Sequence, residues 1–122
     1  MLITLDPESA VPPFEQVRAQ IAEMARSGEA PVGTKLPTVR GLAEQLGLAA
    51  NTVAKAYREL ESAGVVQTRG RHGTVIAASG DRSLALAAEA AAAYAERVHG
   101  LGIPAEQARA VVVAALDVAY GG

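Results

Sequence analysis

The stretch Leu36–Gly64, LPTVRGLAEQLGLAANTVAKAYRELESAG, predicts two short helices joined by a turn. In the second helix, apolar side chains recur at the i, i+3, i+4 and i+7 spacing of a buried stripe, at Val53, Ala56, Tyr57 and Leu60. At 100° per residue, the opposite face carries an amide, two cations and a hydroxyl, from Asn51, Lys55, Arg58 and Ser62. Such a face suits a DNA major groove, but an ordinary surface helix is also polar outside. The pattern of this helix alone therefore does not distinguish a DNA-binding helix from an ordinary surface helix.

The boundaries of the neighbouring helices are also marked in the sequence. Thr38 after Pro37 is a good N-cap for a helix predicted over Val39–Leu46, and Gly47 ends that helix. An earlier helix begins at Pro12 and Pro13. Proline lacks a backbone N–H, which costs nothing there because the first N–H groups of a helix have no partner within the helix. Its apolar stripe is Phe14, Val17, Ile21 and Met24, and Gly28 suits its left-handed cap. Residues 2–5 alternate in polarity and predict either a short edge strand or an extended arm.

Beyond Gly64 the hydrophobic period changes from helical to alternating. Residues 65–68 and 74–77 predict two strands, and residues 69–73, RGRHG, predict the turn between them. Glycines and charges are common in any solvated turn. Directly after a helix-turn-helix pattern, however, the hairpin is better interpreted as the wing of a winged helix. Its arginines are then expected along the phosphate backbone or in the minor groove of DNA.

The tail, residues 79–122, predicts two helices that follow a short hinge at residues 78–80. Residues 81–99 are alanine-rich, and Pro104 and Glu106 begin a last helix that runs to Ala119. A 44-residue tail cannot bury both apolar faces by itself, so its helices either pack on the preceding domain or pair with another chain. Their self-complementary faces favour a twofold dimer. The predicted dimerisation residues are Leu84, Ala88, Ala91, Ala95, Val111, Val112, Ala115 and Leu116.

Composition excludes several classes of protein. The chain has 122 residues, enough for one domain or for a small domain with an appendage. It has no cysteine, which excludes disulfides and thiolate metal sites and fits a reducing cytoplasm. The N-terminus lacks a signal-peptide pattern, and no apolar run reaches membrane-spanning length. We therefore expect a cytoplasmic protein with no membrane partner.

Positive charge is concentrated in the middle of the chain. Residues 34–78 hold six Lys and Arg against three Glu, a net charge of +3, whereas residues 1–33 carry −3 and residues 79–122 carry −2. This is expected if the middle segment alone meets phosphates. His72 and His99 without cysteine do not make a zinc site, and the sequence has no phosphate-binding loop or nucleophile elbow. Neither a cofactor nor an enzymatic activity is expected.

The sequence resembles the GntR family of bacterial transcription regulators, and within it the YtrA-like subfamily with its short two-helix C-terminal part. The matching segments, spread over roughly residues 12 to 77, are Pro13–Val17, Gly33–Arg40, Leu42–Ala43, Leu46–Gly47, Asn51–Val53, Ala56–Leu60, Gly64 and Gly73–Val75. The tail matches the subfamily in length and helix count only. The resemblance implies a winged helix-turn-helix that binds an operator as a homodimer and usually represses transcription.

The resemblance also implies which residues contact DNA. Arg40 matches an arginine at the start of the helix-turn-helix, the second helix matches the recognition helix, and residues 69–72 match the wing. The predicted DNA-binding residues are Lys35, Thr38, Arg40, Asn51, Thr52, Lys55, Arg58, Arg69, Arg71 and His72.

Three alanines depart from the family pattern. Many relatives have Ser or Thr where Ala49 stands, so this chain lacks a helix N-cap worth about 1 kcal/mol. Relatives often have Arg where Ala50 or Ala54 stands, so bidentate guanine contacts are lost here. We therefore expect base readout to depend on the remaining polar residues of the recognition helix and on the wing.

Each predicted contact has a structural alternative. Arg40 could pair with Glu44 one helical turn away. Asn51 could merely cap the recognition helix, and Arg58 could be engaged by Glu61 or Ser62. Tyr57 is expected in the core rather than at DNA.

We expect a mainly α fold with a small β-hairpin wing. A winged helix-turn-helix DNA-binding domain over residues 1–78 precedes a two-helix dimerisation or effector segment over residues 79–122. The expected function is that of a homodimeric repressor at a palindromic double-stranded operator, with a small-molecule effector as an additional partner. A winged-helix protein-interaction module is the alternative, but the cationic helix face and the two-arginine wing count against it. An effector pocket between the tail helices is compatible, although the tail offers few polar groups to orient a ligand.

Overall fold

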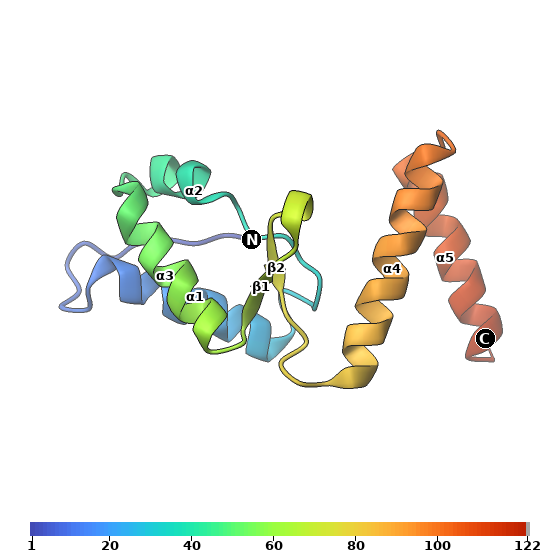
Figure 1. The fold of residues 1–122 in the computed structure, drawn as a ribbon, viewed down its shortest axis with the longest axis horizontal. Coiled ribbons are helices and arrows are strands. Elements are labelled where there is room, and N and C mark those ends of the chain that lie inside the picture. The colour runs from blue at the N-terminus through green and yellow to red at the C-terminus, as the bar shows by residue number, and fades with distance from the viewer. Residues whose placement is uncertain (122) are drawn as a thin grey trace. The chain divides into compact units, whose positions relative to one another are not determined.

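The computed structural model describes residues 1–121, except for the side chain of Arg71. The described chain contains five α-helices, a short 3-10 helix and an antiparallel hairpin: α1 (Pro13–Ser27), α2 (Val39–Leu46), α3 (Ala50–Ser62), β1 (Val66–Thr68), η1 (Gly70–His72), β2 (Thr74–Ile76), α4 (Arg82–Gly100) and α5 (Ala105–Ala119). It divides into two compact units, Met1–Ala85 and Leu86–Gly122. The mainly helical fold with a two-stranded wing is as expected (Figure 1).

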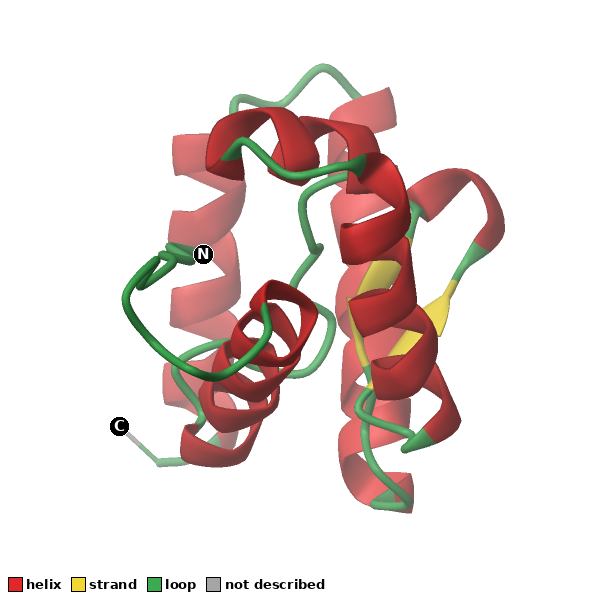
Figure 2. Cartoon of the chain, turned by 90° about the vertical axis from the view of Figure 1, so that its left-hand side faces the viewer, coloured by secondary structure: helices red, strands yellow, loops and turns green. Residues whose placement is uncertain are grey.

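Helices α1, α2 and α3 enclose the core of the N-terminal unit. Figure 2 shows α2 running across the end of α3, with the yellow hairpin behind α3. The apolar stripes predicted from the sequence point inward, and the side chains of Val17, Ile21, Val53, Ala56 and Leu60 are at most 1% exposed. Burying a large aliphatic side chain of this kind contributes about 1.5–3 kcal/mol. The core thus fixes which face of α3 is turned to solvent.

Capping groups end the helices where the sequence predicts. Thr38 Oγ1 accepts a hydrogen bond from the Gly41 amide at 3.0 Å, which confirms Thr38 as the N-cap of α2. Gly47 follows α2 with φ of 69°, and Gly28 follows α1 with φ of 84°, both in the left-handed region. The Gly47 cap begins the short turn between α2 and α3.

The N-terminal residues form an extended arm along α1, one of the two alternatives left open by the sequence. Ile3 of this arm is only 2% exposed. Gln20 bonds both backbone groups of Thr4, accepting from its amide at 3.0 Å and donating to its carbonyl at 2.6 Å. One turn earlier, Gln16 Oε1 accepts from the Asp6 amide at 2.8 Å. The side chains of Gln16 and Gln20 thus make hydrogen bonds to the backbone of the arm that a neighbouring strand would otherwise make.

A third extended segment, residues 33–36, pairs with the outer edge of β2, and the sequence analysis did not anticipate it. The Leu36 amide donates to the Thr74 carbonyl at 2.8 Å, and the Ile76 amide donates to the Thr34 carbonyl at 2.9 Å. Lys35 lies opposite Val75 in this antiparallel bridge. The wing hairpin is therefore joined to the chain that leads into α2.

The C-terminal unit is a helical hairpin with almost no core of its own. Tyr94 of α4 donates its hydroxyl hydrogen to the Ala108 carbonyl of α5 at 2.7 Å. Ala108 is the one buried residue of α5, and α4, which the structure describes throughout, has none. In the described part of the chain, no helix is both long enough and apolar enough to span a membrane.

Tyr57 links the core of α3 to the segment before α2. Its side chain is buried, as expected, and its hydroxyl donates to the Pro37 carbonyl at 2.7 Å. Burial disfavours the charged phenolate and raises the pKa of Tyr57 to about 12.

Removal of this hydroxyl gives a test. Tyr57→Phe leaves the Pro37 carbonyl without its donor and should lower the free energy of unfolding by about 1 kcal/mol in urea denaturation. The exposed Tyr120→Phe is the matched control and should change nothing. The unaltered chain should also lose stability as the pH rises from 10 towards 12, because the unfolded state releases the phenolic proton first. Equal stability of Tyr57→Phe and the unaltered chain at neutral pH would contradict the assignment.

Candidate nucleic-acid interface

The outward face of α3 carries the polar side chains that the sequence places there. Asn51, Lys55 and Arg58 are exposed, and Thr52 is half-buried. They lie opposite the fully buried Val53 side of the same helix. The core therefore presents an amide and two cations on one surface, as a helix that enters a major groove requires.

Lys55 is oriented by an aromatic ring from another helix. Its ammonium nitrogen lies 3.9 Å from the centroid of the Phe14 ring in the first turn of α1. Phe14 is half-buried, so its ring is held in place while the ammonium stays exposed. A cation–π contact at an exposed site contributes about 0.5–1 kcal/mol. This is enough to orient Lys55 but small enough for the side chain to leave the Phe14 ring and contact a ligand. Helical periodicity treats Phe14 only as a core residue and does not reveal this contact.

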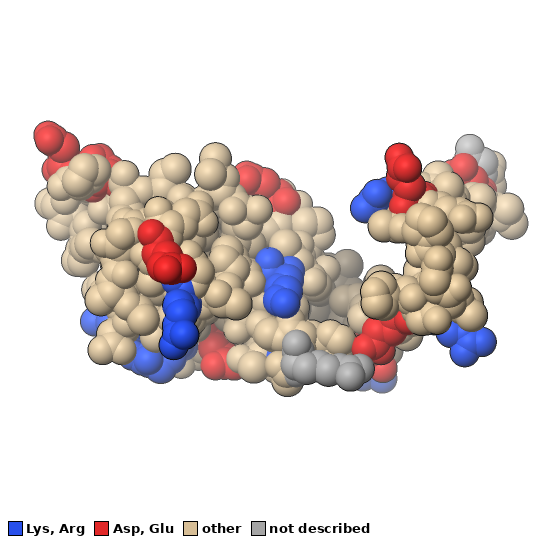
Figure 3. Space-filling model, turned by 90° about the horizontal axis from the view of Figure 1, so that it is seen from above, with Lys and Arg blue, Asp and Glu red and all other residues tan. Residues whose placement is uncertain are grey.

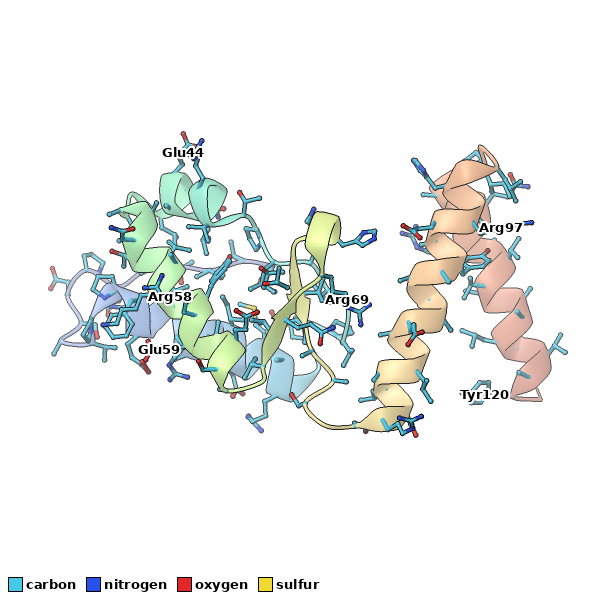
Figure 4. The ribbon with its side chains drawn as sticks, in the orientation of Figure 1. Glu44, Arg58, Glu59, Arg69, Arg97 and Tyr120 are labelled. Carbon is cyan, nitrogen blue, oxygen red and sulfur yellow. The ribbon has the colours of Figure 1, made fainter. Side chains whose placement is uncertain are left out.

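The first turn of α2 adds a further cation. Arg40 is exposed, and no ion pair joins it to Glu44 among the described side chains, so the structural alternative for Arg40 is not realised. Thr38 uses its oxygen as the helix cap, which leaves its hydroxyl hydrogen for another acceptor. Figure 4 shows Glu44 on α2 well away from Arg58 on α3.

Arg58 is likewise not neutralised by its own helix. Within the described residues it makes no ion pair, and the neighbouring Glu61 carboxylate accepts instead from Thr68 Oγ1 at 3.2 Å. Arg58, Lys55, Glu59 and Ser62 line a shallow hollow on α3. This side of the helix is open to a ligand that carries negative charge.

The wing brings a separate set of polar groups together. Arg69 Nε and Nη2 lie 2.6 and 2.9 Å from the Gln67 side-chain oxygen, in the amide orientation that satisfies both residues. The loop closes where the Arg69 amide donates to the Gly73 carbonyl at 2.7 Å. Gly73 has φ of 77°, and a Cβ there would lie 3.2 Å from Lys35 Cε, so the lysine stem crosses the wing at this point. Lys35 and His72 are exposed, and the side chain of Arg71 lies outside the described residues.

The arginines of α1 differ from the cations of the interface, because carboxylates on the same helix neutralise them. Arg18 forms an ion pair with Glu15, and Arg26 with Glu23. The hydrogen bond from each arginine lowers the pKa of its glutamate and raises the pKa of the arginine. Figure 3 shows basic and acidic side chains spread over the visible face of this unit. The cations of α2 and α3, in contrast, are not paired with carboxylates in the described chain.

No group of three or more His, Cys, Asp or Glu side chains in the described part of the chain is placed to hold a metal ion. The chemistry that the interface offers is hydrogen bonding by amide and hydroxyl groups together with positive charge. These are the groups that recognise base edges and phosphates.

Comparisons with known proteins agree with this description. A family model described as bacterial regulatory proteins, gntR family, matches residues 13–76. The HTH-type transcriptional regulator Rv1152 of Mycobacterium tuberculosis is 50% identical over 101 residues, which cover 83% of this chain and 83% of that protein. The HTH-type transcriptional repressor YtrA of Bacillus subtilis is 40% identical over 83 residues, 68% of this chain and 64% of the repressor.

Solved structures show the same fold. YtrA from Sulfolobus acidocaldarius, a GntR-family transcription factor, aligns with a TM-score of 0.60 and 33% identity, over 75% of this chain and 97% of that chain. AraR(DBD) in complex with operator ORE1 aligns with a TM-score of 0.52 and 28% identity, over 63% of this chain and 94% of that chain.

Fold, interface and relatives together define a winged helix-turn-helix transcription regulator that binds DNA. The relatives bear the names of regulators, which confirms that the chain is not an enzyme. The chain belongs to the gntR family of bacterial regulatory proteins and is YtrA-like within it.

The N-terminus of α3 supports a stability test. Ala49 has the extended N-cap conformation, with φ of −68° and ψ of 145°, but no side-chain cap bond. Ala49→Ser should supply that bond and raise the free energy of unfolding by about 1 kcal/mol in thermal or urea denaturation. Ala50→Ser, one residue inside the helix, is the control and should not stabilise the protein. A larger gain for Ala50→Ser than for Ala49→Ser would contradict the cap geometry.

Proposed function

We propose that this chain is a cytoplasmic homodimeric repressor that reads a palindromic operator with α3 and the wing and dimerises through α4 and α5. The observation that carries the proposal is the set of unpaired cations on α2 and α3, turned away from a core that buries the opposite face of α3. Arg40, Lys55 and Arg58 are exposed and make no ion pair among the described residues.

In this proposal α3 enters the major groove and α2 lies against the backbone beside it. The Asn51 amide is suited to bind adenine bidentately, and Lys55 reaches guanine or phosphate. Arg40 and the Thr38 hydroxyl at the start of α2 contact phosphates and fix the register of the protein on the duplex. Thr52, half-buried in the first turn of α3, contacts the edge of the groove.

The wing extends the contact to the adjacent stretch of backbone. Arg69 approaches phosphates from the hairpin, and Lys35 approaches them from the segment that pairs with β2. His72 lies at the tip of the hairpin, and Arg71 is a further cation. The bond from Arg69 to Gln67 holds the guanidinium near the hairpin, so we place it on the backbone rather than deep in a groove. Ala49, Ala50 and Ala54 offer no polar group to a base, so specificity is shared between the helix and the wing.

Repression is inferred from the relative whose name states it. YtrA of Bacillus subtilis is named a transcriptional repressor, and it is similar to this chain over 68% of the length of the chain. A protein bound at an operator near a promoter excludes RNA polymerase, which requires only the DNA contacts described above.

Dimerisation is inferred from the exposed apolar surface of the C-terminal unit. Seven of the eight residues proposed for the interface lie in this unit, and Leu84 lies in α4 just before it. Leu84, Val111 and Leu116 are each about half exposed. The visible face of this unit in Figure 3 is mostly uncharged, with charged groups near its margins. A twofold dimer buries such a face against itself and places two recognition helices about one DNA turn, roughly 34–36 Å, apart.

The DNA contacts can be tested by fluorescence anisotropy with DNA from upstream of the transcription unit that encodes the chain. Arg40→Ala and Lys55→Ala should each lower affinity about tenfold and reduce the slope of log K against log salt by about 0.9 for a lost phosphate contact. The melting temperature of Arg40→Ala should stay unchanged, because this side chain is exposed and makes no ion pair in the described chain. Lys55→Ala should lose only the contact with the Phe14 ring, about 0.5–1 kcal/mol of stability. Arg97→Ala in α4 is the control for lost charge and should bind normally. A salt-independent affinity of the unaltered chain would refute DNA binding through this face.

The interface can be tested with two valines of equal exposure on α5. Val111 is 52% exposed and Val113 is 51% exposed, but they lie about 160° apart around the helix. Val111→Glu, on the proposed face, should give a monomer in sedimentation velocity, because a buried carboxylate is costly. Val113→Glu should remain a dimer. A dimer for Val111→Glu, or a monomer for the unaltered chain, would overturn the proposed interface.

A further inference from the structure

A cleft of about 390 Å³ lies between α4 and α5, near the turn that joins them. Its walls are mostly apolar, and the hydrogen bond between the Tyr94 hydroxyl and the Ala108 carbonyl ties them together at 2.7 Å. Val98, Ile103 and Val112 supply branched aliphatic surface. The volume falls within the range of about 300–1,000 Å³ that small-molecule sites occupy.

Two basic side chains also line the cleft, from opposite helices. His99 comes from the last turn of α4, and Arg109 comes from α5. The described lining of the cleft holds no Asp or Glu, and Arg109 makes no ion pair among the described side chains. An apolar cleft with positive charge and no acidic group is complementary to a ligand with an apolar body and an anionic end.

A second copy of the chain is a poorer occupant of this cleft than an anion. Apolar residues of a partner packed here would remove the Arg109 guanidinium from water without a counter-charge, at a cost of several kcal/mol, and would leave the His99 ring without a polar partner. Of the residues proposed for the dimer, only Ala95 and Val112 line the cleft in the described structure. Leu84, Ala88 and Leu116 lie elsewhere on the helices. The cleft is therefore at the margin of the proposed dimer face.

We propose that this cleft binds a small amphipathic carboxylate, with the carboxylate on Arg109 and His99 and the aliphatic chain between Val98, Ile103 and Val112. The inference rests on the proposed function to the extent that such a ligand would act as the effector of the regulator. By holding α4 against α5, the ligand changes the surface that the pair offers to a second copy, and so couples ligand binding to DNA binding.

Methyl NMR of the full-length protein can test the site, because the chain has four isoleucines, at positions 3, 21, 76 and 103. With isoleucine δ1-methyl labelling, Ile103 reports on the cleft, and the other three report on the N-terminal unit. Octanoate should shift the Ile103 signal saturably and leave the other three in place. Octylammonium, with the same chain length and opposite charge, should not shift it.

Charge variants complete the test. Arg109→Gln should weaken octanoate binding at least about tenfold, as expected for a lost charge-assisted bond, while Arg97→Gln, outside the cleft, should bind within about twofold of the unaltered chain. The proposal fails if octylammonium shifts Ile103 equally, if Arg109→Gln binds octanoate normally, or if octanoate does not bind. It also fails if the Ile103 signal shifts when the protein is diluted but does not shift when octanoate is added. A second copy of the chain would then fill the cleft. Operator binding by the same preparation is measured without octanoate, so a failure of the DNA proposal is detected separately.

Discussion

One hydrogen bond connects the parts of the N-terminal unit that we propose face DNA. The Tyr57 hydroxyl, carried by α3, holds the Pro37 carbonyl at 2.7 Å. Residues 33–36, just before Pro37, pair with β2 of the wing, and Thr38, just after it, caps α2. The recognition helix, the helix before it and the wing therefore meet at a single short segment. Because this bond is partly buried, its loss would leave polar groups incompletely satisfied, which favours a fixed arrangement of the three elements.

Helical periodicity and capping chemistry were sufficient to predict most of the architecture. The stripes of α1, α2 and α3 pack in or against the core, and Thr38 and Gly47 cap α2 as their chemistry requires. The hairpin lies where the period changes from 3.6 to 2. These features depend on residues close together in the chain, and local preference is what a sequence displays directly. The spacing of Asn51, Lys55 and Arg58 predicted their shared exposed face for the same reason.

Contacts between distant residues were not predicted. The segment at residues 33–36 is too short to show alternation, and Gly33 and Pro37 mark it as a turn. The clamp of Gln16 and Gln20 on the N-terminal arm uses side-chain amides in place of a strand, which no periodicity encodes. The approach of Lys55 to Phe14 depends on how α1 crosses α3. In the tail, composition predicted helices but not a cleft lined by Arg109 and His99.

The sparse burial in the C-terminal unit bears on how the regulator responds to its own abundance. A helical pair that buries little more than Ala108 has little folding free energy of its own, so its order depends on what covers it. If a second copy supplies that cover, folding of the tail becomes a bimolecular event, and the ordered fraction rises with total protein concentration. The concentration of dimers able to bind two half-sites then increases more steeply than the total concentration of the protein. A regulator built in this way occupies its operator only above a threshold concentration of the protein itself.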